Sequence, residues 1–143
     1  METMPNPTES QIQIAIVDWF SWAWSQYARL LVHYPIGERR IKKHVWSKKA
    51  KKLIWICPDG QKLQRMGAKK DFPDLTLFVA RGGYHGMVME IKKLGEKPRQ
   101  GQLEYLRALE DQEYYACWRD SFESAQSSIN WYMRLKEDIY SDG

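Results

Sequence analysis

The chain has 143 residues, of which 43% are hydrophobic, and it carries a formal net charge of +4. This length and hydrophobic content predict one globular domain over residues 1–143 and exclude an intrinsically disordered chain. No apolar run approaches the roughly 18 residues of a membrane span, and the N-terminus lacks the residue order of a signal peptide. We therefore expect a cytoplasmic protein without a membrane partner. Cys57 and Cys117 have no partner at metal-ligand spacing, so we expect reduced thiols.

The basic residues are unevenly distributed along the chain. Between Arg39 and Lys70 there are twelve Lys or Arg and a single acid, whereas nine acids and four bases follow from Glu104 onwards. A basic segment attracts polyanions, of which nucleic acid is the commonest in the cytosol. A solvated surface explains a charge run equally well. The residues that we expect to contact DNA are Arg39, Arg40, Lys48, Lys49, Lys51, Lys52, Lys69 and Lys70.

The first half of the chain predicts a helix and a basic hairpin. Apolar residues at spacings of three and four predict a helix over 8–31 with Thr8 as its N-cap, and Pro35 excludes its continuation. Two apolar runs flank the lysines of 48–52, which predicts a basic hairpin within 42–57. A turn at 58–60 and a short helix over 61–67 follow.

The second half predicts alternating strands and helices. Residues 75–79 and 87–92 are short, mainly apolar runs joined by a glycine-rich connection, so we expect two strands that pair antiparallel. A helix over 99–112, a strand over 114–118 and a helix over 122–139 complete the pattern. The order predicts an α/β fold with a mixed central sheet flanked by helices.

Three charged residues lie on the paired strands. Asp74 opens the first strand, and Glu90 and Lys92, two apart, project from one face of the second. Two close carboxylates repel each other unless a cation lies between them, and hard oxygen ligands favour Mg²⁺ or Mn²⁺ over zinc. A neighbouring lysine stabilises negative charge on a phosphate, so these groups suit phosphodiester hydrolysis.

By spacing alone, such a pattern is more often structural. A Pro-Asp pair and an E-x-K triplet are both common, and Asp74 could cap a turn while Glu90 and Lys92 form an exposed ion pair. The residues around this pattern make it more specific for a nuclease site. Residues 67–77, Tyr84-His85-Gly86, Glu90-Ile91-Lys92 and Gln102 resemble the virus-type replication-repair nuclease (VRR-NUC) domain of the PD-(D/E)xK nuclease superfamily, in its stand-alone phage-type form.

The resemblance implies a restriction-endonuclease-like fold and a role for each matching residue. Asp74, Glu90 and the backbone carbonyl of Ile91 would bind Mg²⁺ or Mn²⁺, and Glu9 would add a third carboxylate. Lys92 and Gln102 would complete the catalytic group, with no organic cofactor. The chain departs from the family pattern at Ile36, at Asp71, where a glycine is usual, and in the lysine-rich stretch at 42–57, which resembles an insertion.

The resemblance also implies a substrate. Compact stand-alone members act as homodimers on branched DNA, which predicts a Holliday-junction-resolvase-like endonuclease. A flap or 5′-end-directed exonuclease is the alternative within nucleases. A nucleic-acid-binding module with an inactive acidic cluster is the alternative from another class.

Overall fold

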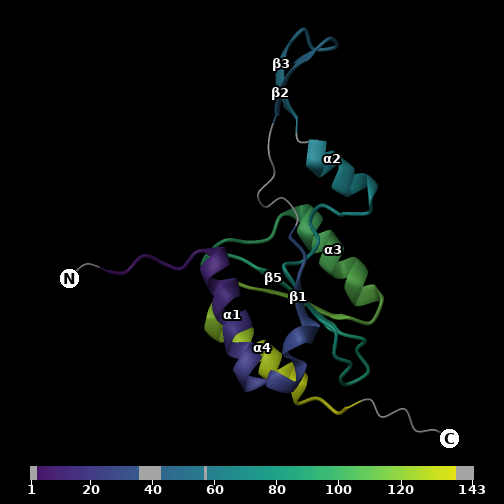
Figure 1. The fold of residues 1–143 in the computed structure, drawn as a ribbon. Coiled ribbons are helices and arrows are strands. Elements are labelled where there is room, and N and C mark those ends of the chain that lie inside the picture. The colour runs from purple at the N-terminus through teal and green to yellow at the C-terminus, as the bar shows by residue number, and fades with distance from the viewer. Residues whose placement is uncertain (1–2, 36–42, 57, 138–143) are drawn as a thin grey trace, which may run out of the picture. The chain divides into compact units, whose positions relative to one another are not determined.

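A computed structural model describes residues 3–35, 43–56 and 58–137 (Figure 1). The chain divides into two compact units, one made of Met1–Tyr34 and Pro73–Gly143 and the other of Pro35–Phe72. The expectation of one domain over residues 1–143 stays a prediction. Each unit is described by itself.

The first unit contains a four-stranded mixed sheet in the order β1-β4-β5-β6. Strands β1 (Leu31–His33), β4 (Leu75–Leu77) and β5 (Met87–Ile91) pair antiparallel in turn, and β6 (Tyr115–Arg119) runs parallel to β5. The helices are α1 (Glu9–Ala23), the 3-10 helix η1 (Ser25–Leu30), α3 (Gln100–Asp111) and α4 (Phe122–Met133). The predicted mixed α/β architecture and the antiparallel pairing of the two central strands are confirmed.

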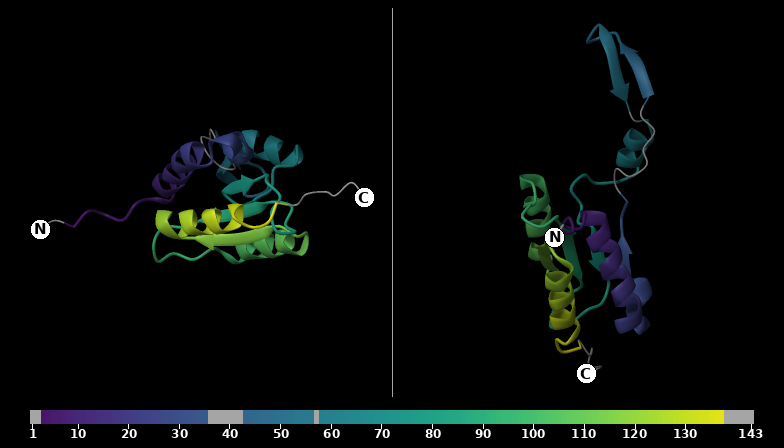
Figure 2. Two further views of the ribbon diagram at one scale, coloured as in Figure 1. Left: turned by 90° about the horizontal axis from the view of Figure 1, so that it is seen from below. Right: turned by 90° about the vertical axis from the view of Figure 1, so that its left-hand side faces the viewer.

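Helices cover both faces of this sheet (Figure 2). Helices α1 and α4 pack against each other, and their apolar residues share one core with Met87, Met89 and Ile91 of β5. Side chains alternate along a strand, so Glu90 points to the opposite face, which α3 covers. Every residue of β5 is buried, as expected for a central strand covered on both sides.

Helix α1 begins as predicted but ends early. The Thr8 hydroxyl accepts a hydrogen bond from the Gln11 backbone at 3.2 Å, and the Gln11 side chain accepts one from the Thr8 backbone at 2.9 Å. This reciprocal cap fixes the start of the helix. The expectation of helix to residue 31 was wrong, because α1 ends at Ala23 and Leu31–His33 form β1 instead. Pairing with β4 outweighs the helical spacing of this segment.

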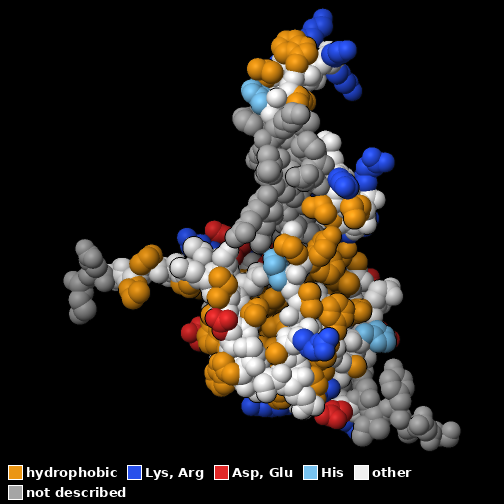
Figure 3. Space-filling view, viewed as in Figure 1, with side chains coloured by type: hydrophobic (Ala, Val, Ile, Leu, Met, Phe, Trp, Pro, Cys, Tyr) orange, Lys and Arg blue, Asp and Glu red, His pale blue; other side chains and the backbone are white. Residues whose placement is uncertain are grey.

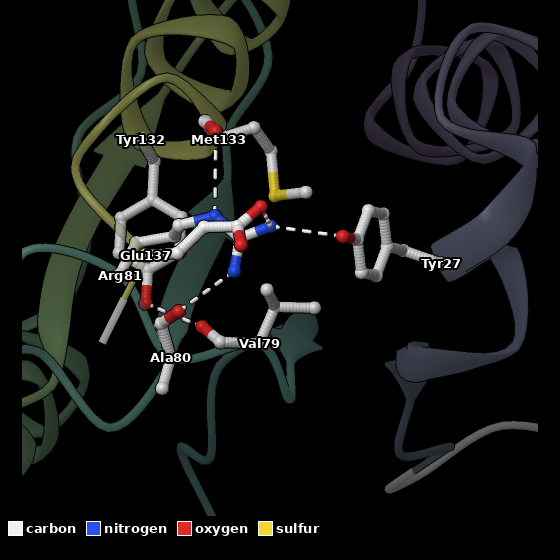
Figure 4. Close-up of polar contacts among 7 residues, drawn as sticks. All are labelled: Tyr27, Val79, Ala80, Arg81, Tyr132, Met133 and Glu137. Atoms are coloured by element: carbon white, nitrogen blue, oxygen red, sulfur yellow. Dashed lines mark hydrogen bonds and ion pairs between the residues drawn. The ribbon is translucent and has the colours of Figure 1, made fainter. Parts of the chain in front are cut away.

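Helix α4 ends at Met133, so the expectation of helix to residue 139 was wrong for residues 134–137; residues 138 and 139 lie outside the described part of the chain. The chain after α4 instead meets the connection between β4 and β5, where the Gly82 backbone donates to the Lys136 carbonyl at 2.8 Å. Buried Arg81 ties these segments together (Figure 4). Its guanidinium donates to the Ala80 carbonyl at 2.9 Å and to the Tyr27 hydroxyl at 3.1 Å, and it lies 3.7 Å from Glu137.

The second unit consists of a two-stranded ribbon followed by a helix. Strands β2 (Lys43–Ser47) and β3 (Lys52–Ile56) pair antiparallel, so the predicted hairpin is present. Helix α2 spans Pro58–Arg65, and the expected turn at residues 58–60 was therefore wrong. Proline is favoured at the first position of a helix, where its missing N–H costs no hydrogen bond.

The tryptophans of the two helices differ in burial. Trp19 of α1 is buried in the core, whereas Trp22 on the same helix is 72% exposed and Trp131 on α4 is 47% exposed. No helix in the described part of the chain is long and apolar enough to cross a membrane.

Candidate active site

The pairing of β4 with β5 brings two carboxylates together. Leu75 pairs with Met89 and Thr76 with Val88, so the same register extended by one residue sets Asp74 opposite Glu90. Residues directly opposite in an antiparallel pair share a face of the sheet. The Asp74 carboxylate also accepts a hydrogen bond from the Ile91 backbone N–H at 2.8 Å. Asp74 is thus fixed at the end of the strand pair, as the sequence predicted.

A histidine that the sequence analysis did not assign to the site holds the backbone of Asp74. The His33 Nδ1 lies 2.7 Å from the Asp74 carbonyl oxygen. Because a carbonyl oxygen only accepts, Nδ1 carries the proton in this contact. The end of β1 therefore supports the start of β4, and this contact depends on a strand that the sequence pattern did not reveal.

Glu90 is a buried acid with a raised pKa. It is 3% exposed, and its Oε2 atom is buried without a hydrogen-bond partner among the described residues. Burial, and after it the charge of Asp74, raise the pKa of Glu90 to about 8, while Lys92 acts in the opposite direction. A buried carboxylate with one unsatisfied oxygen beside a second carboxylate is costly in free energy. A proton removes that cost below about pH 8, and a cation at this place would remove it as well.

Gln102 satisfies the other oxygen of Glu90. Its side-chain Nε2 donates to Glu90 Oε1 at 2.9 Å, and its Oε1 accepts from the Arg99 backbone at 2.9 Å. Gln102 is 7% exposed on the first turn of α3. The structure therefore brings Gln102 to the Glu90 carboxylate, and the start of α3 orients its amide.

Lys92 lies between two acids. Its Nζ is 3.8 Å from Glu90 Oε1 and 3.9 Å from Glu9 Oε1. Lys92 is 9% exposed, so its charge is largely removed from water and the two acids compensate it. Glu9 approaches Lys92 from the first turn of α1, and its role as a third carboxylate at the metal stays a prediction. The structure pairs it with Lys92.

The donor set suits a hard divalent cation. Asp74 and Glu90 offer carboxylate oxygens, which Mg²⁺ and Mn²⁺ prefer. Glu90 Oε2, which accepts no hydrogen bond from the described residues, is free to act as a metal ligand. Within the described residues, no group of three or more His, Cys, Asp or Glu side chains converges as a ready-made metal cage. Mg²⁺ commonly binds to one or two carboxylates and keeps several waters, so two carboxylates are enough. Glu9 and the Ile91 carbonyl stay predicted ligands.

The same fold occurs in a known structure. The chain is similar to a solved structure described as "VRR_NUC domain protein", with 25% sequence identity, a TM-score of 0.73 and 93% of each chain covered. The chain has a VRR_NUC-like fold. No family model and no curated protein matches it. The resemblance drawn from the sequence is confirmed by this structural match, and a VRR_NUC fold implies a nuclease.

One departure from the VRR_NUC pattern has a structural explanation. Asp71 stands where the family resemblance expects a glycine, and its φ angle is 68°. This left-handed region favours glycine, and aspartate is among the few other residues that adopt it readily. The backbone at Asp71 therefore keeps a conformation that a glycine would also take.

The lysines expected to contact DNA lie in the second unit. Lys48, Lys49, Lys51 and Lys52 are exposed at the turn of the β2–β3 ribbon, and Lys69 and Lys70 are exposed after α2. Arg39 and Arg40 lie outside the described residues. The DNA-contacting role of all eight residues stays a prediction.

Proposed function

We propose that this chain is a Mg²⁺- or Mn²⁺-dependent deoxyribonuclease whose active site consists of Asp74, Glu90, Lys92 and Gln102. The observation that carries the proposal is the buried Glu90 carboxylate, with one oxygen unsatisfied, opposite Asp74 and 3.8 Å from the Lys92 ammonium. Such an arrangement of charge in a fold core has a high cost unless it binds something. The VRR_NUC-like fold supports the same conclusion.

Each side chain has a distinct task in this proposal. Asp74 and Glu90 would hold the cation, and Glu9 would approach it directly or through water. A bound divalent cation acidifies an attacking water and polarises the phosphate. Lys92 stabilises the negative charge that develops on the phosphate oxygens as water attacks, and it helps orient that water. Gln102, which donates a hydrogen bond to Glu90 Oε1, keeps the Glu90 carboxylate oriented toward Asp74.

We further propose that the substrate is branched DNA and that the enzyme acts as a homodimer. The support is the resemblance to compact stand-alone VRR-NUC domains, together with the exposed lysines of the β2–β3 ribbon. Two symmetric active sites match the two symmetric strands of a four-way junction. A flap or 5′-end-directed exonuclease needs only a monomer, which makes the two possibilities separable.

A cleavage assay tests the function. End-labelled four-way junction, flap, duplex and single-stranded DNA would be incubated with the full chain and either Mg²⁺ or Mn²⁺, and light scattering would give the oligomeric state. We expect metal-dependent cutting, with paired symmetric nicks in the junction by a dimer. Cutting only from 5′ ends by a monomer would favour the exonuclease. Binding without cutting under either metal would contradict the enzyme proposal.

A further inference from the structure

The β2–β3 ribbon has two different faces. The register sets Val45 opposite Ile54 on one face and Trp46 opposite Leu53 on the other. Val45 and Ile54 are half-buried, whereas Trp46 is 61% exposed and Leu53 is 55% exposed. One face of the ribbon therefore presents an adjacent aromatic and aliphatic side chain to solvent. This pair offers apolar surface that a partner could cover.

The turn of this ribbon is strongly basic. Between Lys43 and Ile56 the sequence contains no acid. The turn is held by a hydrogen bond from the Ala50 backbone to the Ser47 hydroxyl at 3.1 Å and by the left-handed conformation of Lys51, with φ of 52°. Its lysines, Lys48, Lys49, Lys51 and Lys52, are exposed. Figure 3 shows Lys and Arg side chains in blue at the tip of the ribbon. The ribbon thus combines an exposed aromatic side chain with a positive end.

These two properties together select a particular ligand. Lysines alone bind the phosphates of any nucleic acid, single-stranded or duplex. An exposed aromatic ring adds affinity only where a base offers its flat face, and the bases of a duplex are already stacked on each other. We propose that the β2–β3 ribbon binds unpaired nucleotides of DNA, with Trp46 stacked on a base and the turn lysines on the neighbouring phosphates. This inference rests on the proposed nuclease function and not on the four-way junction, whose strands are fully paired; among branched DNAs it favours those with unpaired nucleotides, such as a flap.

Binding without cleavage tests the ribbon directly. The full chain would be titrated, in EDTA, into a fluorescent 20-nucleotide single strand and into the matching duplex, and anisotropy would report binding. We expect Trp46→Ala to weaken single-strand binding about tenfold and duplex binding by less than about twofold. Trp46→Phe should restore most of the loss, since phenylalanine also stacks. Trp22→Ala, which removes an exposed tryptophan of the first unit, should change neither affinity.

The salt dependence separates stacking from charge. The double substitution of Lys48 and Lys49 by alanine should weaken binding to both DNAs and lower the slope of log affinity against log salt by about 1–2. Trp46→Ala should leave that slope unchanged. Equal losses on single strand and duplex, no loss, or a loss matched by Trp22→Ala would overturn the proposal. Because no metal is present, a chain that never cuts would contradict the nuclease function and leave this result standing.

Discussion

The β4–β5 strand pair and the β2–β3 ribbon both carry charged side chains, but those of the strand pair are buried and those of the ribbon turn are exposed to water. Glu90 and Lys92 are 3% and 9% exposed, whereas the lysines of the ribbon turn lie in water. Buried charges interact strongly, shift each other's pKa values and depend on their partners. Exposed charges are screened, and each contributes a small and nearly independent amount. Single substitutions should therefore have large effects at the first region and small ones at the second.

The largest effect is expected at Lys92. Lys92→Ala removes the ammonium that would stabilise charge on the phosphate, and single-turnover cleavage should fall by about a thousandfold or more. DNA affinity in EDTA should change by less than about threefold. The neighbouring exposed Lys93 provides the matched control, and Lys93→Ala should cut at nearly the wild-type rate. Similar losses in both variants would show that Lys92 acts only through general charge.

A smaller loss is expected at Gln102. Gln102→Ala leaves Glu90 Oε1 without its donor and the Arg99 backbone without its acceptor, so cleavage should fall about ten- to a hundredfold. The metal concentration needed for half-maximal activity should rise with it, because Glu90 is no longer oriented. Gln100→Ala, at an exposed position of the same turn, should retain activity. A fall in melting temperature with unchanged metal requirement would assign Gln102 a purely structural role.

Metal requirement should depend on pH through Glu90. The pKa of Glu90 is raised to about 8, so below that pH a cation must displace a proton from it. The half-maximal metal concentration should fall about tenfold per pH unit between pH 6 and 8 and then level off. Measurement of single-turnover cleavage against Mn²⁺ at each pH would show the slope. A constant requirement across this range would mean that Glu90 is not a ligand.

Removal of the Glu90 charge should stabilise the metal-free protein. The pKa of Glu90 is near 4.5 in the unfolded chain and about 8 in the folded one. The free energy of unfolding therefore falls as pH rises between these values, because the folded chain must lose the proton of a buried carboxyl. Glu90→Gln should raise the melting temperature in EDTA by several degrees at pH 8.5 and by little at pH 5. An equal shift at both pH values would attribute the change to packing.

The smallest effect is expected at the ribbon turn. Lys49→Ala removes one of several exposed positive charges, so cleavage at low salt should fall only about two- to threefold. The loss should disappear at high salt, where charge contributes little. A large loss that persists at high salt would place Lys49 in the active site. It would contradict the expectation that single substitutions in the ribbon have small effects.

The sequence could predict the parts of the site that depend on local patterns. Asp74 and Glu90 lie opposite each other because two short, mainly apolar strands joined by a glycine-rich connection pair antiparallel. Gln102 was identified through the family resemblance, and its burial agrees with the spacing of four residues to buried Leu106 on α3.

Other features depend on contacts between distant segments. The predicted helix extended to Leu31, but Leu31–His33 pair with β4, and this pairing makes them a strand. The contact of His33 with Asp74 follows from that pairing and could not be anticipated. Trp22 lies three residues after buried Trp19 on α1, yet it is 72% exposed, so helical spacing alone does not decide which tryptophan the described core covers.

The central claim is that Asp74 and Glu90 together bind the divalent cation that cleavage requires. Binding of Mn²⁺ to the wild type, Asp74→Asn and Glu90→Gln, followed by electron paramagnetic resonance at pH 8.5, tests it most directly. We expect binding by the wild type and a loss of at least about tenfold in affinity in each variant. Unchanged Mn²⁺ affinity in either variant would contradict the account.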